Sequence, residues 1–265
     1  MIPLRDYRKS RTFPAVTVAL VILNLLMFSF QLTRSANTTQ ILDVSAWADA
    51  GLSFADDPAT QGWIRIAERD LFVFSYGLVP GEFLGGVDLP PTIPIPLWIT
   101  LFASMFLHGG VLHLLGNMLY LWIFGDNVED AMGHVRFLVF YLVCGGVAAF
   151  SQIAIGPGSG VPLIGASGAI AGVLAAYFML FPHSRVLTLI PIFFFVRLAA
   201  IPAVFLLGLW FIFQVVSGAG SISATSGVAW FAHIGGFLAG LVLVFAFRRR
   251  GVPVVLWEMI RRRRY

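Results

Sequence analysis

Six long apolar runs, separated by short polar or glycine-rich segments, constrain this chain of 265 residues more than any other feature. A helix needs about 20 apolar residues to cross the hydrocarbon core of a bilayer, and each run has roughly that length. Only 11% of the residues are charged, against about 25% in soluble domains, and the mean hydropathy is +0.88. The sequence therefore predicts an all-α, polytopic membrane protein with six transmembrane helices, at about residues 13–32, 101–125, 135–155, 164–181, 198–217 and 228–247.

The distribution of charge predicts which side of the membrane each loop faces. Residues 33–97 carry eight Asp and Glu but only three Lys and Arg, whereas basic residues dominate both ends of the chain and the connections on the other side. Basic loops stay in the cytoplasm. We therefore expect a cytoplasmic basic N-terminus (1–12), a membrane domain (13–247) with a long extracytoplasmic loop (33–100), and a cytoplasmic basic tail (248–265).

Other features agree with a membrane protein and exclude competing classes. The pI of 9.6 does not indicate nucleic-acid binding, because the basic residues flank apolar runs. The first run has no A-x-A cleavage site after it, so we expect a retained transmembrane helix and not a signal peptide. Cys144 is the one cysteine and is expected to be packing material. The apolar stretch Leu187–Val196 is short and contains Pro191, which predicts an interfacial segment or an extension of the fifth helix.

Unusual polar residues lie near the outer ends of the second, fourth and sixth runs, all of which enter the membrane from the same side. The second run contains His108, His113 and Asn117, the fourth contains Ser167, and the sixth contains His233. At a rise of 1.5 Å per residue, each lies within roughly 5–20 Å of the outer surface. Ionisable residues inside a membrane are costly and mark functional sites. Three polar clusters at one depth predict a common site.

These side chains form a set suited to acyl transfer. A histidine beside Ser167 can take its proton during attack, which makes His233 the expected base. His113 and Asn117 are four residues apart and share a helix face, so both can stabilise an oxyanion together with the backbone N–H of Ser167. No Asp or Glu lies in the last three runs, which predicts a Ser–His dyad. The nearest carboxylates follow the inner end of the second run, at Asp126, Glu129 and Asp130.

Glycines predict close contact between the fourth and sixth helices. His233, Gly236 and Gly240 have the spacing of one helix face, and Gly168 and Gly172 form a small-xxx-small pair. Small residues let two helices approach closely, which would bring the serine and the histidine within hydrogen-bond reach.

Other interpretations of these residues remain. A serine in a transmembrane helix commonly bonds to its own backbone, and polar residues can join helices. A metal site formed by His108, His113 and His233 is weakly indicated, because no Cys, carboxylate or HExxH pattern accompanies them. A transporter would show charges at the membrane midplane or broken helices in paired halves, and neither is evident.

The motifs resemble those of the rhomboid intramembrane serine proteases. GASGAIAG around Ser167 resembles the family's GxSG motif, AHIGGFLAG around His233 resembles AHxxGxxxG, and HLLGN, with His113 and Asn117, resembles HxxxN. The resemblance extends from about Pro80 to Gly240, and the combination of three motifs in order is specific.

The resemblance implies a six-helix rhomboid core of bacterial type, placed in the inner membrane, which uses no cofactor. Its partners would be the lipid bilayer and transmembrane protein substrates, cleaved in or near their membrane-spanning segments. The alternative is an inactive rhomboid relative that binds membrane clients. We expect His108 and Gly168 to contribute to substrate or water access. Two family features are missing: Trp98 is not followed by Arg, and Ala171 stands where some members stack a Tyr on the histidine.

Overall fold

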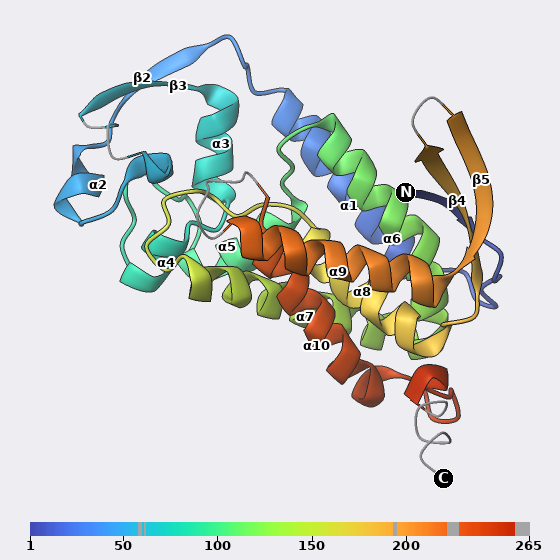
Figure 1. Ribbon diagram of the computed structural model, residues 1–265. Coiled ribbons are helices and arrows are strands. Elements are labelled where there is room, and N and C mark those ends of the chain that lie inside the picture. Colours follow the sequence, from blue (N-terminus) through green and yellow to red (C-terminus); the bar gives the residue numbers. More distant parts are fainter. Residues whose placement is uncertain (58–59, 61, 193–194, 222–227, 258–265) are drawn as a thin grey trace.

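The computed structural model describes residues 1–57, 60, 62–192, 195–221 and 228–257, and most of them are helical (Figure 1). The helices are α1 (Ala15–Leu32), α2 (Ser45–Asp49), η1 (Phe54–Asp56), α3 (Glu68–Tyr76), α4 (Pro80–Gly85), α5 (Leu97–Ala103), η2 (Ser104–Phe106), α6 (Val111–Met132), α7 (His134–Ile155), α8 (Ser167–Leu180), α9 (Ala203–Ser221) and α10 (Trp230–Phe247). The strands are β1 (Ile2–Asp6), β2 (Thr39–Asp43), β3 (Trp63–Ala67), β4 (Arg185–Ile192) and β5 (Phe195–Pro202).

Each of the six predicted runs contains a helix, so the prediction of a polytopic, mainly helical membrane protein is confirmed. Among the described helices, α1, α7, α9 and α10 are long and apolar enough to cross a membrane on their own. The second run forms a bent pair with α6 as its long arm, and α8 is a shorter apolar helix of 14 residues. The sheets are additions outside the bundle.

The prediction of one continuous helix over residues 101–125 is wrong, because α5 and α6 meet at an angle of 83°. At the bend, backbone N–H and carbonyl groups that would be hydrogen-bonded within a continuous helix are instead bonded to residues from other parts of the chain. The Gln31 side chain on α1 accepts from the backbone N–H of His108 and donates to its carbonyl, at 3.3 and 2.7 Å. The Ser104 carbonyl accepts from the N–H of Gly165 at 2.9 Å. The long arm α6 also continues past the predicted end and includes Asp126, Glu129 and Asp130.

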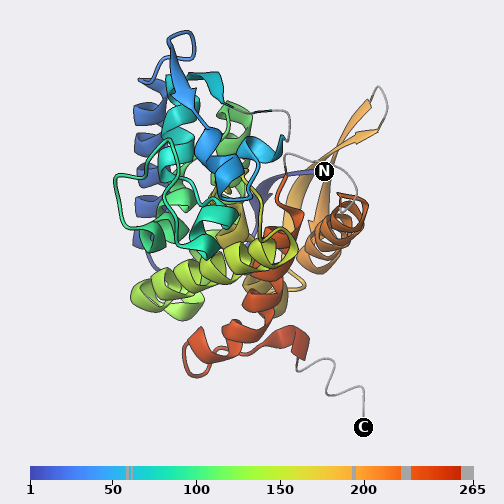
Figure 2. The same ribbon diagram turned by 90° about the vertical axis from the view of Figure 1, so that its left-hand side faces the viewer.

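The region before the fifth membrane helix is a β-hairpin, which corrects two predictions. The fifth helix begins at Ala203 and not at residue 198. The described residues of the stretch Leu187–Val196 belong to β4 and β5 and not to an extension of that helix, while its interfacial location stays a prediction. Within the described residues, β4 pairs antiparallel with β5, and β1 from the N-terminus pairs with β4, Ile2 lying opposite Leu189. The hairpin projects away from the bundle (Figure 2).

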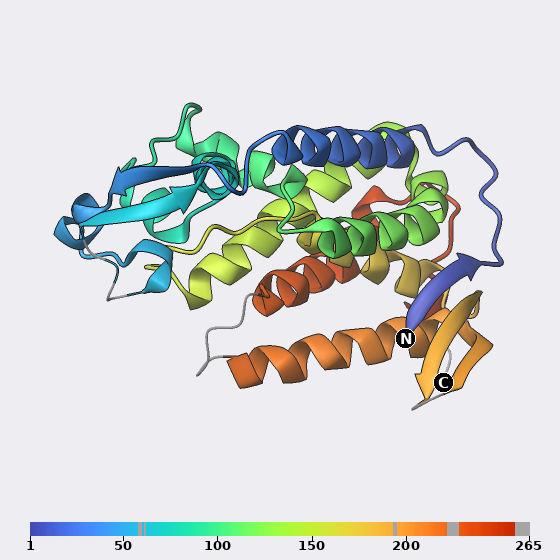
Figure 3. The ribbon, with the colours of Figure 1, turned by 90° about the horizontal axis from the view of Figure 1, so that it is seen from above.

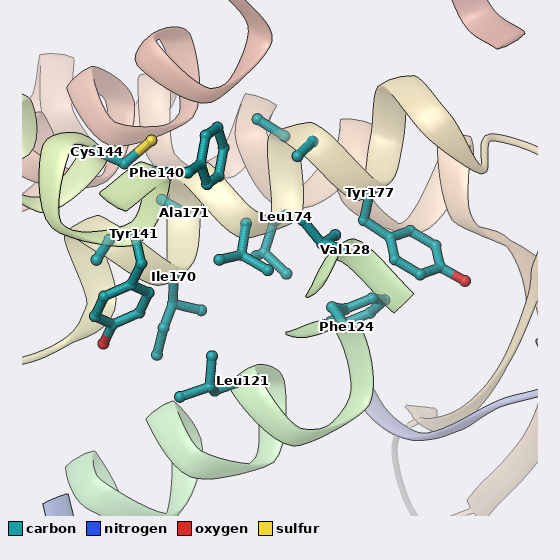
Figure 4. Packing of buried hydrophobic residues seen from close by; sticks show 14 of the residues in the cluster. Leu121, Phe124, Val128, Phe140, Tyr141, Cys144, Ile170, Ala171, Leu174 and Tyr177 are labelled. Carbon is teal, nitrogen blue, oxygen red and sulfur yellow. The ribbon is translucent and has the colours of Figure 1, made fainter. Parts of the chain in front are cut away.

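Helix α8 lies at the centre of the bundle. It is apolar on every face, which is typical of a helix surrounded by other helices. In Figure 4 its residues Ile170, Leu174 and Tyr177 pack between side chains of α6 and α7. Cys144 on α7 is among these buried side chains, as expected for packing material. The central position of α8 fixes the depth of its first residue, Ser167.

The segment between α1 and α5 forms a small subdomain with a separate apolar cluster, which we call the outer subdomain after the side of the membrane predicted for it. Its buried residues are Val44, Trp47, Phe54, Ile66, Val79 and Leu89. Asp56 attaches this subdomain to the connection before α8, because its carboxylate accepts from the Ser159 hydroxyl at 2.8 Å and the Gly160 N–H at 2.5 Å. The subdomain therefore lies at the end of the bundle where α8 begins.

The first strand and the end of the last helix lie at the opposite end of the bundle from this subdomain. The Asn127 side chain, near the end of α6, donates to Asp6 of β1 at 3.1 Å. The N–H of Arg249, just after α10, donates to the Ala131 carbonyl of α6 at 2.9 Å. Residues 222–227 and the tail beyond Trp257 lie outside the described residues. This tail is part of the predicted cytoplasmic basic segment 248–265.

Candidate active site

Ser167 is the first residue of α8, and this helix starts inside the bundle. The chain that precedes it is held on both sides: Leu163 pairs with Leu78 of the outer subdomain, and the Gly165 N–H donates to the Ser104 carbonyl at 2.9 Å. Gly165 has φ +112°, a conformation that L side chains rarely adopt, so the turn into α8 requires glycine. The serine hydroxyl is thereby presented at a helix N-terminus, toward the end of the bundle that carries the subdomain.

His233 lies in the first turn of α10 and meets the serine directly. Its Nε2 is 2.8 Å from the Ser167 Oγ. This distance is that of a hydrogen bond. The two residues predicted to form a dyad are therefore in contact.

The glycines predicted to set this contact do so through backbone packing. A Cβ atom on Gly236 would lie 2.0 Å from the Gly168 carbonyl oxygen, and one on Gly240 would lie 2.3 Å from the Gly172 carbonyl oxygen. Neither distance leaves room for a side chain, and a backbone carbonyl cannot rotate away. The expected close approach of α8 and α10 is confirmed.

The other ring nitrogen of His233 binds Gln214, a residue that the sequence analysis missed. The Oε1 atom of Gln214 on α9 lies 2.8 Å from His233 Nδ1. Its side chain is buried, as the residue is 3% exposed. Trp210 and Trp230 flank the imidazole, with ring centroids 6.0 and 6.3 Å away. Ala171 carries no aromatic ring, as noted from sequence, and these three side chains surround the imidazole in its place.

A signal for Gln214 was present in the sequence. From Ala203 to Val216 it is the one residue with a strongly polar side chain, in a helix that is otherwise apolar. Burying an amide in an apolar environment is costly unless it finds a partner. Such an isolated amide in a membrane helix indicates a buried polar contact.

His113 and Asn117 lie on one face of α6 and point to the same place as the serine. The His113 ring packs against Gly165, where a Cβ atom would lie 2.8 Å from its Cε1. Asn117 is buried, and within the described part of the chain its Nδ2 has no hydrogen-bond partner. A buried amide donor without a partner is rare in native structures. The Asn117 amide is thus available to a ligand oxygen.

A cavity of about 1380 Å³ joins these side chains. Ser167, His233, His113 and Asn117 all line it, together with apolar residues of α8 and the connection before it. The cavity is larger than the roughly 300–1,000 Å³ of sites that bind small molecules.

Residues 96–250, more than half of the chain, match the Rhomboid domain family. The chain belongs to the rhomboid family. This rhomboid protein is 29% identical over 166 residues to the mitochondrial presenilin-associated rhomboid-like protein of Mus musculus, which covers 60% of the chain and 42% of the relative. It is 34% identical over 167 residues to RHOMBOID-like protein 1 of Arabidopsis thaliana, covering 63% of the chain and 39% of the relative. The chain spans about two fifths of the length of these curated relatives.

The family match includes every residue of the candidate site and excludes most of the outer subdomain. The candidate site residues Ser167, His233, His113, Asn117 and Gln214 all lie between residues 96 and 250. The β2–β3 hairpin and α2 precede the matched region. They lie outside the matched domain.

The two residues expected to contribute to substrate or water access lie away from the cavity. His108 is fully buried, with its ring edge-on to Phe28 and to His113 at centroid distances of 6.4 and 5.1 Å. It does not line the cavity and lies behind His113. Gly168 faces α7 and α10, with the position of a Cβ atom 2.5 Å from the Ala148 Cβ. This geometry favours a supporting role for both residues: His108 packs against His113, and Gly168 allows α8 to pack against α7 and α10.

Within the described residues, no three His, Cys, Asp or Glu side chains are grouped so that they could hold a metal ion.

Proposed function

We propose that this protein is an intramembrane serine endopeptidase that cleaves membrane-anchored proteins in or near their transmembrane segments. The observation that carries the proposal is the 2.8 Å contact between Ser167 Oγ and His233 Nε2 in the wall of a large cavity. Membership of the rhomboid family supports the same reaction class.

In the proposed reaction, Ser167 Oγ attacks the carbonyl carbon of the scissile peptide bond. The hydroxyl proton passes to His233 Nε2 as the new C–O bond forms. His233 then gives this proton to the leaving amine nitrogen, which leaves an acyl-enzyme. A water molecule, deprotonated by the same nitrogen, hydrolyses the ester and regenerates the serine.

The negative charge that develops on the carbonyl oxygen needs donors aimed at its position in the transition state. We propose that Asn117 Nδ2, the His113 ring and the backbone N–H of Ser167 supply them. The unpartnered amide of Asn117 and its place in the cavity wall support this role. The N-terminus of α8 adds a favourable dipole for an anion.

The catalytic group is a dyad, because no carboxylate stands beside the histidine. Helices α7, α8, α9 and α10 contain no Asp or Glu. The imidazolium formed during attack is therefore stabilised by neutral groups, among them the Gln214 amide oxygen.

The test uses purified protein in detergent or liposomes with a fluorophosphonate probe and a model transmembrane substrate. We expect the wild type to be labelled and to cleave, and Ser167→Ala and His233→Ala each to lose cleavage while staying folded in the membrane. Because the two groups act as a unit, the double variant should be little worse than either single variant. Full cleavage by either single variant contradicts the proposal.

The alternative function is that of an inactive rhomboid relative that binds membrane clients. It predicts that the wild type is neither labelled nor able to cleave, while still capturing a transmembrane protein. The hydrogen-bonded Ser–His pair favours the protease, because a client-binding protein has no need of it.

We further propose that this integral membrane protein resides in a bacterial inner membrane with both ends in the cytoplasm. The basic ends and the acidic segment 33–97 support this orientation. The relatives named as mitochondrial make a mitochondrial membrane the rival location. Reporter fusions at residue 1 and within the outer subdomain decide the orientation: activity of a periplasmic reporter is expected in the outer subdomain alone.

A further inference from the structure

We propose that Gln214 is a positioning residue that holds His233 in the tautomer able to accept the serine proton. This inference rests on the proposed dyad and adds a third member, carried by a different helix. The supporting contact is the 2.8 Å separation between Gln214 Oε1 and His233 Nδ1, on the far side of the ring from Ser167.

The orientation of the Gln214 amide follows from its second contact. Its Nε2 lies 3.3 Å from the Trp210 carbonyl oxygen, one turn earlier in α9. A carbonyl oxygen can accept a hydrogen bond and cannot donate one. The amide NH₂ must therefore face Trp210, which turns the amide oxygen toward His233.

This orientation fixes the protons on the imidazole. The amide oxygen is an acceptor, so Nδ1 of His233 must carry the hydrogen. In the neutral ring, Nε2 then has the free lone pair, and it is this atom that lies 2.8 Å from Ser167 Oγ. The chain of contacts from the Trp210 carbonyl through Gln214 to His233 thus leaves the serine hydroxyl as donor and the histidine as acceptor, the arrangement that proton transfer requires.

Among the described residues, no other side chain is placed to accept the hydrogen on His233 Nδ1. Ala171 offers no ring and no acceptor, and the flanking Trp210 and Trp230 rings contact the imidazole faces and edge without accepting from Nδ1. Ser167 on α8 contacts His233 directly, and His113 and Tyr120 on α6 line the same cavity. Asp56 lines it too, and its carboxylate accepts from the Ser159 hydroxyl and the Gly160 N–H. The helices packed against His233, α7 to α10, contain no Asp or Glu.

The cost of burying Gln214 supports a role beyond packing. A Met of similar shape would remove the polar group from an otherwise apolar helix without a loss of volume. Among the described residues, the polar contacts of this amide, which is 3% exposed, are those with His233 and the Trp210 carbonyl. Without the histidine, an apolar side chain at this position would pack at least as well.

The test compares three variants of the full-length protein. Gln214→Met keeps the shape and removes the acceptor, and Gln214→Glu keeps an acceptor oxygen and adds a charge. Ile212→Met, on the same helix with a side chain that is 58% exposed, is the matched control. The measurements are kcat and KM for a transmembrane substrate, the fluorophosphonate labelling rate, the pH profile and thermal stability.

We expect Gln214→Met to lower kcat and the labelling rate by about 10–10²-fold with little change in KM, less than the roughly 10⁴-fold lost when a soluble triad loses its charged tautomer-setting group. Gln214→Glu should stay within about tenfold of the wild type, and the acid limb of its activity should move to higher pH, because a carboxylate stabilises the imidazolium. A packing role predicts the reverse order, with Glu worst and Met unchanged. That reverse order overturns the proposal.

Histidine labelled with ¹⁵N gives a second measurement that does not need a variant at Gln214. The His233 signals, assigned by their loss in His233→Ala, should report the Nδ1–H tautomer in the wild type, and the Nε2–H tautomer overturns the proposal. The proposed function fails separately, if the wild type neither labels nor cleaves. A wild type that labels and cleaves, beside an equally active Gln214→Met, refutes the positioning role alone.

Discussion

Replacing Gly236 by alanine tests whether backbone contact between α8 and α10 sets the Ser–His distance. The added Cβ atom would lie 2.0 Å from the Gly168 carbonyl oxygen, whereas ordinary contact begins at 3.4 Å. The helices would have to separate by about 1.4 Å, the difference between these two distances. A separation along the same direction would stretch the 2.8 Å Ser167–His233 contact to about 4 Å, beyond a hydrogen bond.

Both activity and stability should respond. A displacement of about 1 Å at a catalytic group can cost roughly 10²-fold in rate, so we expect that loss in substrate cleavage and in fluorophosphonate labelling of Ser167. Overpacking of a close contact costs about 1–3 kcal/mol of unfolding free energy. Gly240→Ala, two turns from the dyad, meets the Gly172 oxygen at 2.3 Å and should have a comparable stability cost with a smaller loss of labelling.

Gly146→Ala is the matched control. Gly146 is on α7, and nothing lies within 4 Å of its added Cβ atom. An alanine in a helix interior is favoured over glycine by roughly 0.5–1 kcal/mol, so this variant should keep full activity and gain slight stability. Wild-type labelling by Gly236→Ala would refute the argument, since the dyad distance would then not depend on the glycine contact.

Two further predictions concern the oxyanion donors and the outer subdomain. Asn117→Ala should lower kcat by up to about 10²–10³-fold with little change in KM, since its amide would bind charge present only in the transition state; steady-state kinetics that show a KM effect alone would contradict the role. Burial raises the pKa of Glu82, in the first turn of α4, to about 7. The protonated carboxyl therefore contributes its full stability below about pH 4.5, and this contribution is lost as the pH rises through about 7. Glu82→Gln stays neutral and keeps the acceptor for the Leu89 N–H, so it should raise the melting temperature more at pH 8 than at pH 5.

The sequence predicted the helix pair that carries the dyad because the determinants are local. The spacing of His233, Gly236 and Gly240 depends only on helix geometry, and the two helices enter from the same side by the alternation of loops. This prediction of a shared helix face stays valid even if the predicted ends of the helix are wrong by a few residues. The structure accordingly shows the expected contact between α8 and α10.

The errors arose where distant residues decide the local conformation. The break between α5 and α6 depends on Gln31, 77 residues from His108, which pairs with both backbone groups of that residue. The β4–β5 hairpin is stabilised by β1 from the start of the chain. Apolar runs without clear periodicity are compatible with helix or strand, so residues 187–202 could not be assigned from their own composition.

The candidate site also separates two requirements onto different helices. The distance between the serine and the histidine is set by α8 and α10, whose backbones touch, so it is insensitive to side-chain motion. The orientation of the imidazole is set by α9, which lies at the margin of the bundle (Figure 3) and contacts α10 mainly through aromatic packing, including Phe211 on Phe237 at 4.4 Å. Changes in α9 packing should therefore disturb the orientation of the imidazole while leaving the Ser–His distance intact. Changes at the glycines should lengthen the Ser–His distance while leaving the Gln214–His233 contact in place.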